Sequence, residues 1–125
     1  MQFESLNLYH LYSRGNNKQK IFFSRKNCLF FLEKSRKYIL PYADVLCYCL
    51  MPNHFHFLIH TKSDLIKKEF SNSIRILLSS YATAIQFQEK LVGSLFQQNC
   101  KAKLISTVSS SDKMEINEHP FVCFN

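Results

Sequence analysis

The sequence predicts an α+β fold in which a four-stranded antiparallel sheet carries two helices on one face. Two observations lead to this prediction. Short runs rich in aromatic and β-branched residues are interspersed with two longer amphipathic segments, and the elements follow the order strand, helix, strand, strand, helix, strand. That order is typical of the split βαβ sandwich of ferredoxin-like folds. A chain of 125 residues is long enough for one such domain with one core.

The first half of the pattern comprises a strand, a helix and a hairpin. Residues 6–14 are expected to form the first strand, because the segment is aromatic and a Gly-Asn-Asn turn follows it. Ser24 is a suitable N-cap for a helix over 25–40, which a proline ends. Strands are expected at 44–51 and 53–61, joined by a tight Met-Pro-Asn connection.

The second half comprises a long helix and a fourth strand. The helix is expected to begin at Ser63 and to reach about residue 91, where a glycine ends it. Its apolar positions recur in steps of four, three, four and four, which is the period of an amphipathic helix: Phe70, Ile74, Leu77, Tyr81 and Ile85. Residues 94–105 are expected to form the fourth strand.

The composition changes after this strand, and the chain is therefore divided into three parts. Residues 1–105 are predicted to be the folded domain. Residues 106–118 are polar and aperiodic, which indicates a loop or a disordered segment. Residues 119–125 turn apolar behind a proline, and we expect them to be the first turn of a C-terminal helix that is cut short at Asn125.

The charge and the cysteines restrict the partners and the compartment. Sixteen basic and nine acidic residues give a net charge of +7, which favours a polyanionic partner, although solubility alone is an alternative explanation. No apolar run reaches the roughly 20 residues that span a bilayer, and residues 1–6 lack the basic start of a signal peptide. The five cysteines are odd in number and contain no Cys-x-x-Cys pair, which predicts reduced thiols in the cytoplasm.

Two histidines alternate with phenylalanines in the third expected strand. His54 and His56 project from one face of the strand, while Phe55 and Phe57 project from the other. Two imidazoles one strand-step apart can bind one divalent metal ion, and a solvated edge strand is the alternative interpretation. The open face also presents basic residues, of which Arg14, Lys101 and Lys103 are the candidates for binding phosphates.

Three ordered motifs resemble those of the HUH-type single-tyrosine transposases, the insertion-sequence and REP-associated group. Residues 9–17, Tyr-His-Leu-Tyr-Ser-Arg-Gly-Asn-Asn, resemble the first strand and Arg-Gly turn of that family. Residues 51–59, Met-Pro-Asn-His-Phe-His-Phe-Leu-Ile, resemble its His-hydrophobe-His strand. Residues 93–97, Gly-Ser-Leu-Phe-Gln, followed by Lys101 and Lys103, resemble its last strand.

The resemblance implies metal-dependent cleavage and rejoining of single-stranded DNA. His54 and His56 would hold Mg²⁺ or Mn²⁺, which polarises the scissile phosphate. A tyrosine would attack the phosphorus, giving a 5′-phosphotyrosine link and a free 3′-hydroxyl, so that no nucleotide cofactor is needed. The partner would be single-stranded or hairpin DNA. Association of two chains into a homodimer stays open.

The nucleophile is where the sequence departs from the family. The REP-associated branch carries it in a Tyr-Ile-His-x-Asn-Pro motif on a C-terminal helix, and residues 119–125 resemble the run that leads into that motif. No tyrosine follows Tyr81, so the expected catalytic tyrosine would lie beyond Asn125, and we expect a C-terminally truncated and inactive domain. Tyr81, with Gln86 as a third ligand, is a weaker candidate, since Tyr81 belongs to the apolar stripe of its helix and is better explained as a core residue.

Two further histidines lie near the predicted pair, and two other functions are compatible with parts of the sequence. His60 shares the face of the pair and is expected to face DNA or solvent, while His10 is better explained as an ordinary strand-surface residue than as part of the site. The alternative function is a nucleic-acid-binding module without chemistry, although the aromatic signature of RNA-recognition domains is missing. A metal-binding regulatory domain is disfavoured, because two histidines without a third protein ligand hold a metal weakly.

Overall fold

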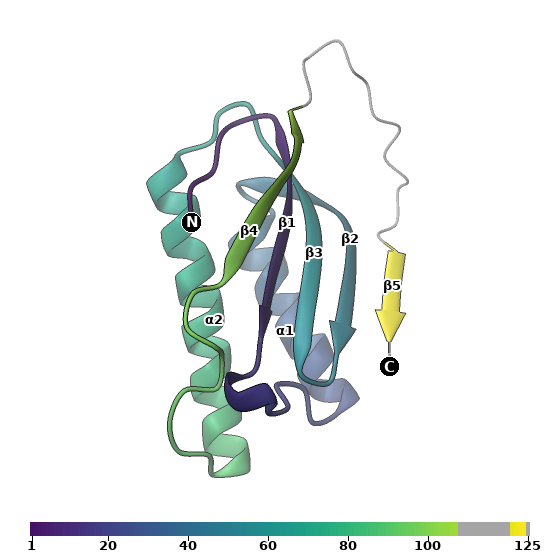
Figure 1. Cartoon of the computed structure of the whole chain (residues 1–125), viewed down its shortest axis with the longest axis vertical. Coiled ribbons are helices and arrows are strands. Elements are labelled where there is room, and N and C mark those ends of the chain that lie inside the picture. Colours follow the sequence, from purple (N-terminus) through teal and green to yellow (C-terminus); the bar gives the residue numbers. More distant parts are fainter. Residues whose placement is uncertain (108–120, 125) are drawn as a thin grey trace.

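The computed structural model of the protein describes residues 1–107 and 121–124. The described residues form two α-helices and one sheet, and Figure 1 shows the helices packed beside the sheet. The elements in chain order are β1 (Asn7–Arg14), a short 3-10 turn η1 (Asn16–Lys18), α1 (Arg25–Ile39), β2 (Ala43–Met51), β3 (His54–Thr61), α2 (Lys67–Glu89), β4 (Lys101–Thr107) and β5 (Phe121–Phe124).

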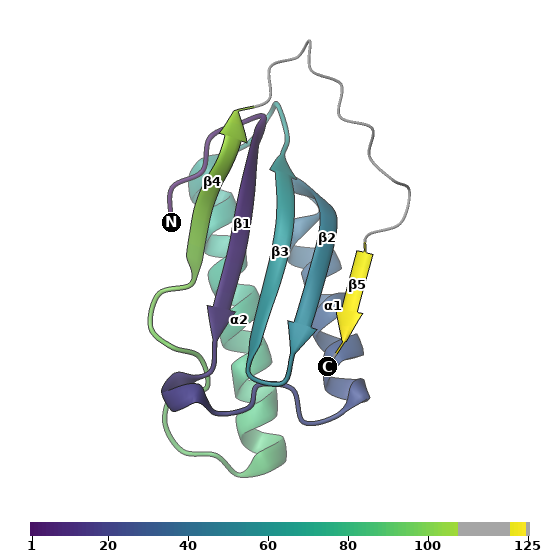
Figure 2. The same cartoon turned by 45° about the vertical axis from the view of Figure 1, so that its right-hand side comes forward.

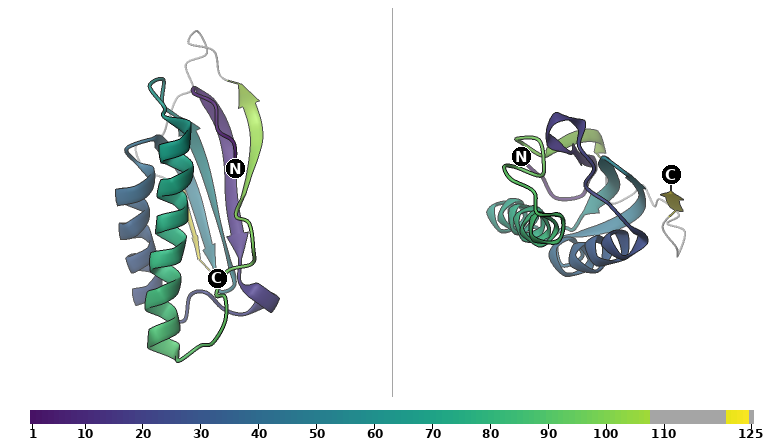
Figure 3. Two further views of the ribbon diagram at one scale, coloured as in Figure 1. Left: turned by 90° about the vertical axis from the view of Figure 1, so that its left-hand side faces the viewer. Right: turned by 90° about the horizontal axis from the view of Figure 1, so that it is seen from below.

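The sheet has the strand order β4-β1-β3-β2-β5. The four strands β4, β1, β3 and β2 pair with one another in antiparallel fashion, as the sequence predicted. The N-terminal strand β1 therefore lies in the interior of the sheet, between β3 and β4. Both helices cover the same face, and Figure 3 shows the opposite face of the sheet without a covering helix.

The fifth strand corrects one prediction. We expected residues 119–125 to begin a helix that is cut short at Asn125, but residues 121–124 form β5, which pairs in parallel with β2 and lies beside it in Figure 2. The Phe-Val-Cys-Phe run suits a strand, and the pairing satisfies backbone groups that an edge strand β2 would leave exposed.

Some predictions fall on residues that the structure does not describe. Asn125, after which we expected the catalytic tyrosine, lies outside the described residues, as do residues 119 and 120. The predicted loop over 106–118 is described only at its first two residues, which belong to β4. The expectation of a nucleophile beyond Asn125 therefore stays a prediction.

Strand β3 separates the core from the open face. Its residues alternate strictly between buried and half-buried, and the buried set is Phe55, Phe57, Ile59 and Thr61. The three apolar side chains of this set meet the apolar stripe of α2 and residues such as Phe31 of α1 to form one core. Because a strand alternates its side chains, burial of this set places His54, His56, Leu58 and His60 on the face away from the helices.

The ends of the helices follow local chemistry. The Ser24 side chain accepts a hydrogen bond from the backbone N–H of Asn27 and caps α1, as predicted. Helix α2 begins at Lys67 rather than Ser63, and it ends at Glu89, where Lys90 adopts a left-handed conformation. Within the described residues, no helix is long and apolar enough to cross a membrane.

The fourth strand starts later than the sequence predicted. Strand β4 begins at Lys101, whereas the expected strand began at residue 94, and β4 extends two residues past the predicted domain end, to Thr107. The motif before it forms a single bridge between Phe96 and Gly15. The backbone N–H of Asn16 donates to Leu95 O, and that of Gln97 donates to Arg14 O, both at 2.8 Å. This segment therefore docks against the end of β1.

Candidate nucleic-acid interface

The strand register gathers polar side chains on the open face. In β1, Tyr12 lies opposite His56, and Arg14 lies opposite His54. In β4, Lys101 lies opposite Tyr12, and Lys103 lies opposite His10. Residues directly opposite each other project from the same face of a sheet, so these histidines and cations share one surface. The helices, on the other face, leave that surface free.

His10 and His56 are in direct contact. His10 Nε2 and His56 Nδ1 lie 2.8 Å apart, so one ring nitrogen donates a hydrogen bond to the other. Their ring centroids are 5.0 Å apart and their planes differ by 24°. Because a hydrogen bond to a ring nitrogen lies near the ring plane, the two imidazoles meet edge to edge. His10, interpreted from the sequence as an ordinary surface residue, is thus a neighbour of the predicted metal pair.

His54 and His56 are each oriented by a hydrogen bond at the Nδ1 atom. His54 Nδ1 donates to Asn53 Oδ1 at 2.7 Å, which leaves the Nε2 lone pair of His54 available. If His56 Nδ1 is the donor to His10, His56 Nε2 is available in the same way. The rings of His54 and His56 have centroids 5.0 Å apart, near enough to share one ion. Among the described residues, no group of three or more His, Cys, Asp or Glu could hold a metal.

Burial is the main influence on the protonation of both His10 and His56. Burial, together with the nearby His10 and His54, lowers the pKa of His56. Burial, together with the charge of Lys103, lowers the pKa of His10. Both rings are therefore held in the neutral form that binds metals.

A pH dependence of stability follows from these shifts. In the metal-free protein, the unfolded chain binds protons to these imidazoles near their ordinary pKa of 6.5, while the folded chain resists protonation. At pH values well above 6.5, His10 and His56 should therefore not change the free energy of unfolding. As the pH falls below 6.5, they should lower it. Urea unfolding at about pH 7.5 and about pH 5.5 measures this decrease. The double variant His10→Leu/His56→Leu should show a smaller decrease, and an equal one would contradict this assignment.

A hollow of about 640 Å³ lies beside His54 and His56. It is lined by Tyr12, Ser13, Arg14, Lys18, Asn53, His54, His56, Gln97, Asn99 and Lys101. Its three cations, Arg14, Lys18 and Lys101, face solvent at least in part, and within the described part of the chain they form no ion pair. Cations without an ion-pair partner, beside two imidazoles, suit a phosphate-containing ligand.

The turn after β1 builds one wall of this hollow. A Cβ at Gly15 would lie 1.9 Å from the backbone oxygen of Gln19, so the tight return of the chain requires glycine here. Lys18 and Asn99, which face the hollow from two different loops, have φ angles of 60° and 68° in the left-handed region. This conformation is costly for lysine, and strained backbone of this kind concentrates at functional sites.

The structure adds Lys18 to the predicted cations and separates Lys103 from them. The sequence does not single out Lys18, because the Gly-Asn-Asn signature that it follows predicts a turn and does not show which side chains the turn directs to a site. Arg14 and Lys101 both line the hollow. Lys103 lies next to His10 instead, on the same face. The Nε2 atom of His60 is buried and lacks a hydrogen-bond partner in the described residues, so it does not face solvent as expected.

Tyr81 and Gln86 are excluded from the site. The side chain of Tyr81 is fully buried beneath the sheet, and its hydroxyl donates to Ile21 O at 2.5 Å. Burial, with a smaller contribution from Cys28, raises the pKa of Tyr81 far above its ordinary value, which disfavours the phenolate that attacks phosphorus. Gln86 donates to Gly93 O on the helix side. The interpretation of Tyr81 as a core residue is therefore correct, and a site made by Tyr81 and Gln86 is wrong.

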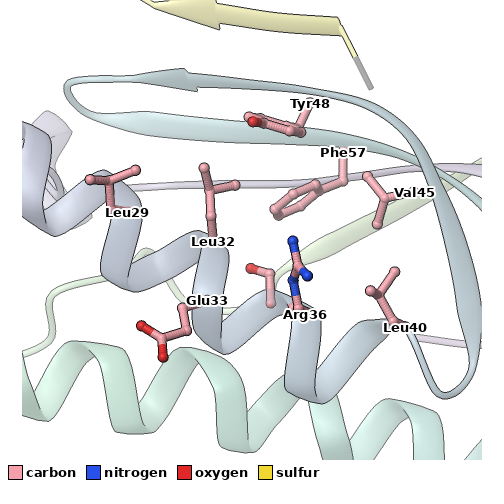
Figure 4. Close-up of a pocket in the computed structure, with 9 residues that line it drawn as sticks. Leu29, Leu32, Glu33, Arg36, Leu40, Val45, Tyr48 and Phe57 are labelled. Carbon is pink, nitrogen blue, oxygen red and sulfur yellow. The ribbon is translucent and has the colours of Figure 1, made fainter. Parts of the chain in front are cut away.

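A second hollow of similar volume, about 650 Å³, lies between α1 and the sheet (Figure 4). Its walls are mainly apolar, with Leu29, Leu32 and Leu40 at the α1 side facing Val45, Tyr48 and Phe57 from the sheet. Glu33 and Arg36 are its ionisable residues besides Tyr48. It contains neither a histidine nor a cluster of cations, so the open face is the better candidate for the chemistry of the chain.

The fold has a counterpart among solved structures. A REP-associated tyrosine transposase bound to a REP hairpin matches with a TM-score of 0.58 and 11% sequence identity. The match covers 86% of this chain and 61% of that chain. No protein-family model and no curated protein matches the sequence. At this identity the likeness shows the fold, and it is the fold of the group whose motifs the sequence resembles.

Proposed function

We propose that the open face of the sheet binds single-stranded or hairpin DNA and presents one backbone phosphate to His54 and His56. The hollow carries this proposal, because it combines two oriented imidazoles with three unpaired cations. The net charge of +7 supports it. The similar fold of a protein that binds a REP hairpin adds to the argument.

His54 and His56 would hold a divalent ion, Mg²⁺ or Mn²⁺, through their Nε2 atoms. The donor set fits in part: two imidazole nitrogens are offered, while both ions prefer oxygen and a six-coordinate shell. Water and the DNA phosphate would complete the shell, so we expect weak binding without DNA. A bound ion would act as a Lewis acid on the phosphate. Asn53 and His10 orient the two imidazoles for this task.

For the complete reaction we propose cleavage and rejoining of a DNA strand through a phosphotyrosine link. In the family that the sequence resembles, the attacking tyrosine belongs to a C-terminal helix, and this sequence has no tyrosine between Tyr81 and Asn125. A fixed nucleophile gains a proximity advantage of about 7–11 kcal/mol, which water or a buried tyrosine lacks. We therefore expect the chain by itself to bind DNA without forming a covalent adduct.

Binding to labelled nucleic acids tests the proposal. Fluorescence anisotropy at low salt should show tighter binding of a DNA hairpin with a single-stranded flank than of blunt duplex DNA. The same strand made of RNA tests the alternative function, a nucleic-acid-binding module without chemistry. Equal or tighter RNA binding that Mn²⁺ does not change would favour that module. Absence of DNA binding at low salt would refute the proposal.

A change at His10 should be seen in metal affinity. His10→Leu removes the hydrogen bond to His56 Nδ1, and loss of such an orienting partner typically costs about 10–100-fold in metal affinity. His10→Gln can keep the bond and should restore much of the affinity. Calorimetric titration with Mn²⁺, in the presence of a hairpin, measures both. His60→Leu, on the same strand face as the pair, is the control and should bind Mn²⁺ like the unmodified protein. Unchanged binding by His10→Leu would contradict the orienting role.

A further inference from the structure

Tyr12 stands between His10 and the hollow. Its ring packs against that of His10, with centroids 4.5 Å apart and planes that differ by 30°. Two rings this close and nearly parallel overlap face to face with an offset. Among the described residues, Tyr12 lines the hollow and His10 does not. One face of the Tyr12 ring is therefore supported by His10, while the ring also borders the open space.

The walls around Tyr12 carry groups that can recognise a base. Asn99 also lines the hollow, and its carboxamide has no hydrogen-bond partner in the described residues. Gln97, which also lines it, accepts a hydrogen bond from Arg14 Nε through its Oε1 atom at 2.5 Å, which leaves its amide N–H groups available. Carboxamides offer a donor and an acceptor that match the edge of a nucleobase.

We propose that the hollow is a nucleotide subsite, in which one base of single-stranded DNA stacks on Tyr12. The support of the ring by His10 holds it in place before binding. Arg14, Lys18 and Lys101 would neutralise the phosphates on either side of that base, one of which lies at His54 and His56. The inference rests on the proposed function, since it adds a base contact to a surface argued to bind the DNA backbone. Stacking on an aromatic ring tolerates any base, so the subsite provides affinity more than sequence choice.

Two substitutions of Tyr12 separate the contribution of its aromatic ring to DNA binding from that of its hydroxyl. Tyr12→Phe keeps the ring and should bind an oligothymidylate of about 12 nucleotides within about twofold of the unmodified protein. Tyr12→Leu keeps an apolar side chain without a ring and should bind about 5- to 150-fold more weakly, the range measured for one stacked base. A strand with the same phosphates but abasic sugars should bind both variants equally. Anisotropy titrations at one low salt concentration measure all these affinities.

The possible outcomes distinguish a failure of the nucleotide subsite from a failure of the proposed DNA-binding function. If the unmodified protein binds oligothymidylate and the abasic strand equally, or if Tyr12→Leu matches Tyr12→Phe, the subsite is refuted while salt-sensitive DNA binding stands. If the unmodified protein binds neither strand at low salt, both the subsite and the proposed function fail. The comparison of the two strands uses the unmodified protein, so it holds even if a variant folds poorly.

Discussion

Replacing Arg14, Lys18 and Lys101 together with glutamine should nearly abolish DNA binding at moderate salt. Each phosphate that a cation neutralises on single-stranded DNA contributes about 0.7 to the slope of log affinity against log salt. Loss of three such contacts should lower the slope by about 2 and the affinity by about 100-fold at roughly 0.1 M salt. Anisotropy titrations over a series of salt concentrations measure both quantities.

A matched variant controls for net charge. Lys26, Lys37 and Lys68 are exposed residues of the two helices, which cover the opposite face of the sheet. Their replacement with glutamine changes the net charge by the same amount but should leave the slope nearly unchanged. If both triple variants lose affinity equally, the general charge of the protein attracts DNA and the hollow has no special role.

Replacing Tyr81 should lower the free energy of unfolding and should have no separate effect on DNA cleavage. Tyr81 packs against Phe31 with ring centroids 4.9 Å apart and against Phe22 at 5.7 Å. Tyr81→Ala removes these contacts and should lower the free energy of unfolding by about 3–5 kcal/mol. Tyr81→Phe keeps the packing but leaves Ile21 O without its donor, and should cost about 1–3 kcal/mol. Urea unfolding of the two variants measures both.

The same Tyr81→Phe variant tests the assignment of Tyr81 as a core residue. After incubation with labelled single-stranded DNA and Mn²⁺, neither it nor the unmodified protein should give a shifted band on a denaturing gel. A band from the unmodified protein that Tyr81→Phe lacks would show that Tyr81 is the nucleophile. Such a result would require its helix to move away from the sheet, because the hydroxyl now donates to Ile21 O in the core.

The fold could be predicted because local patterns and global packing agree. Strict alternation in β3 and the four-residue and three-residue steps of α2 each specify one buried face. The start of β4 was less predictable. Gly93, Ser94 and Leu95 lie in a loop that bridges to β1 through backbone hydrogen bonds, and apolar residues such as Leu95 are buried there without belonging to a strand. The parallel strand β5 depends on a long-range pairing that no local pattern encodes.

The site was predicted only where residues share one strand. His54 and His56 follow from alternation in β3, but His10 joins them from a strand whose partner and register are set by tertiary pairing. Lys18 and Asn99 reach the hollow from loops with left-handed backbone, which side-chain periodicity does not reveal. The contact between Arg14 and Gln97 joins residues 83 positions apart in the sequence.

The interior position of β1 has a consequence for the order of folding. Its pairing with β3 joins segments separated by about one helix and one strand, whereas its pairing with β4 must close most of the chain into a loop. Pairing two segments that are far apart in the sequence closes a long loop, which is entropically costly, so such pairings tend to form late in folding. The loop at residues 94–100, which supplies Gln97 and Asn99, docks through a single bridge and a few hydrogen bonds. His54 and His56 can thus be in place on a partly folded sheet, but the proposed nucleic-acid site is complete only after β4 has paired with β1.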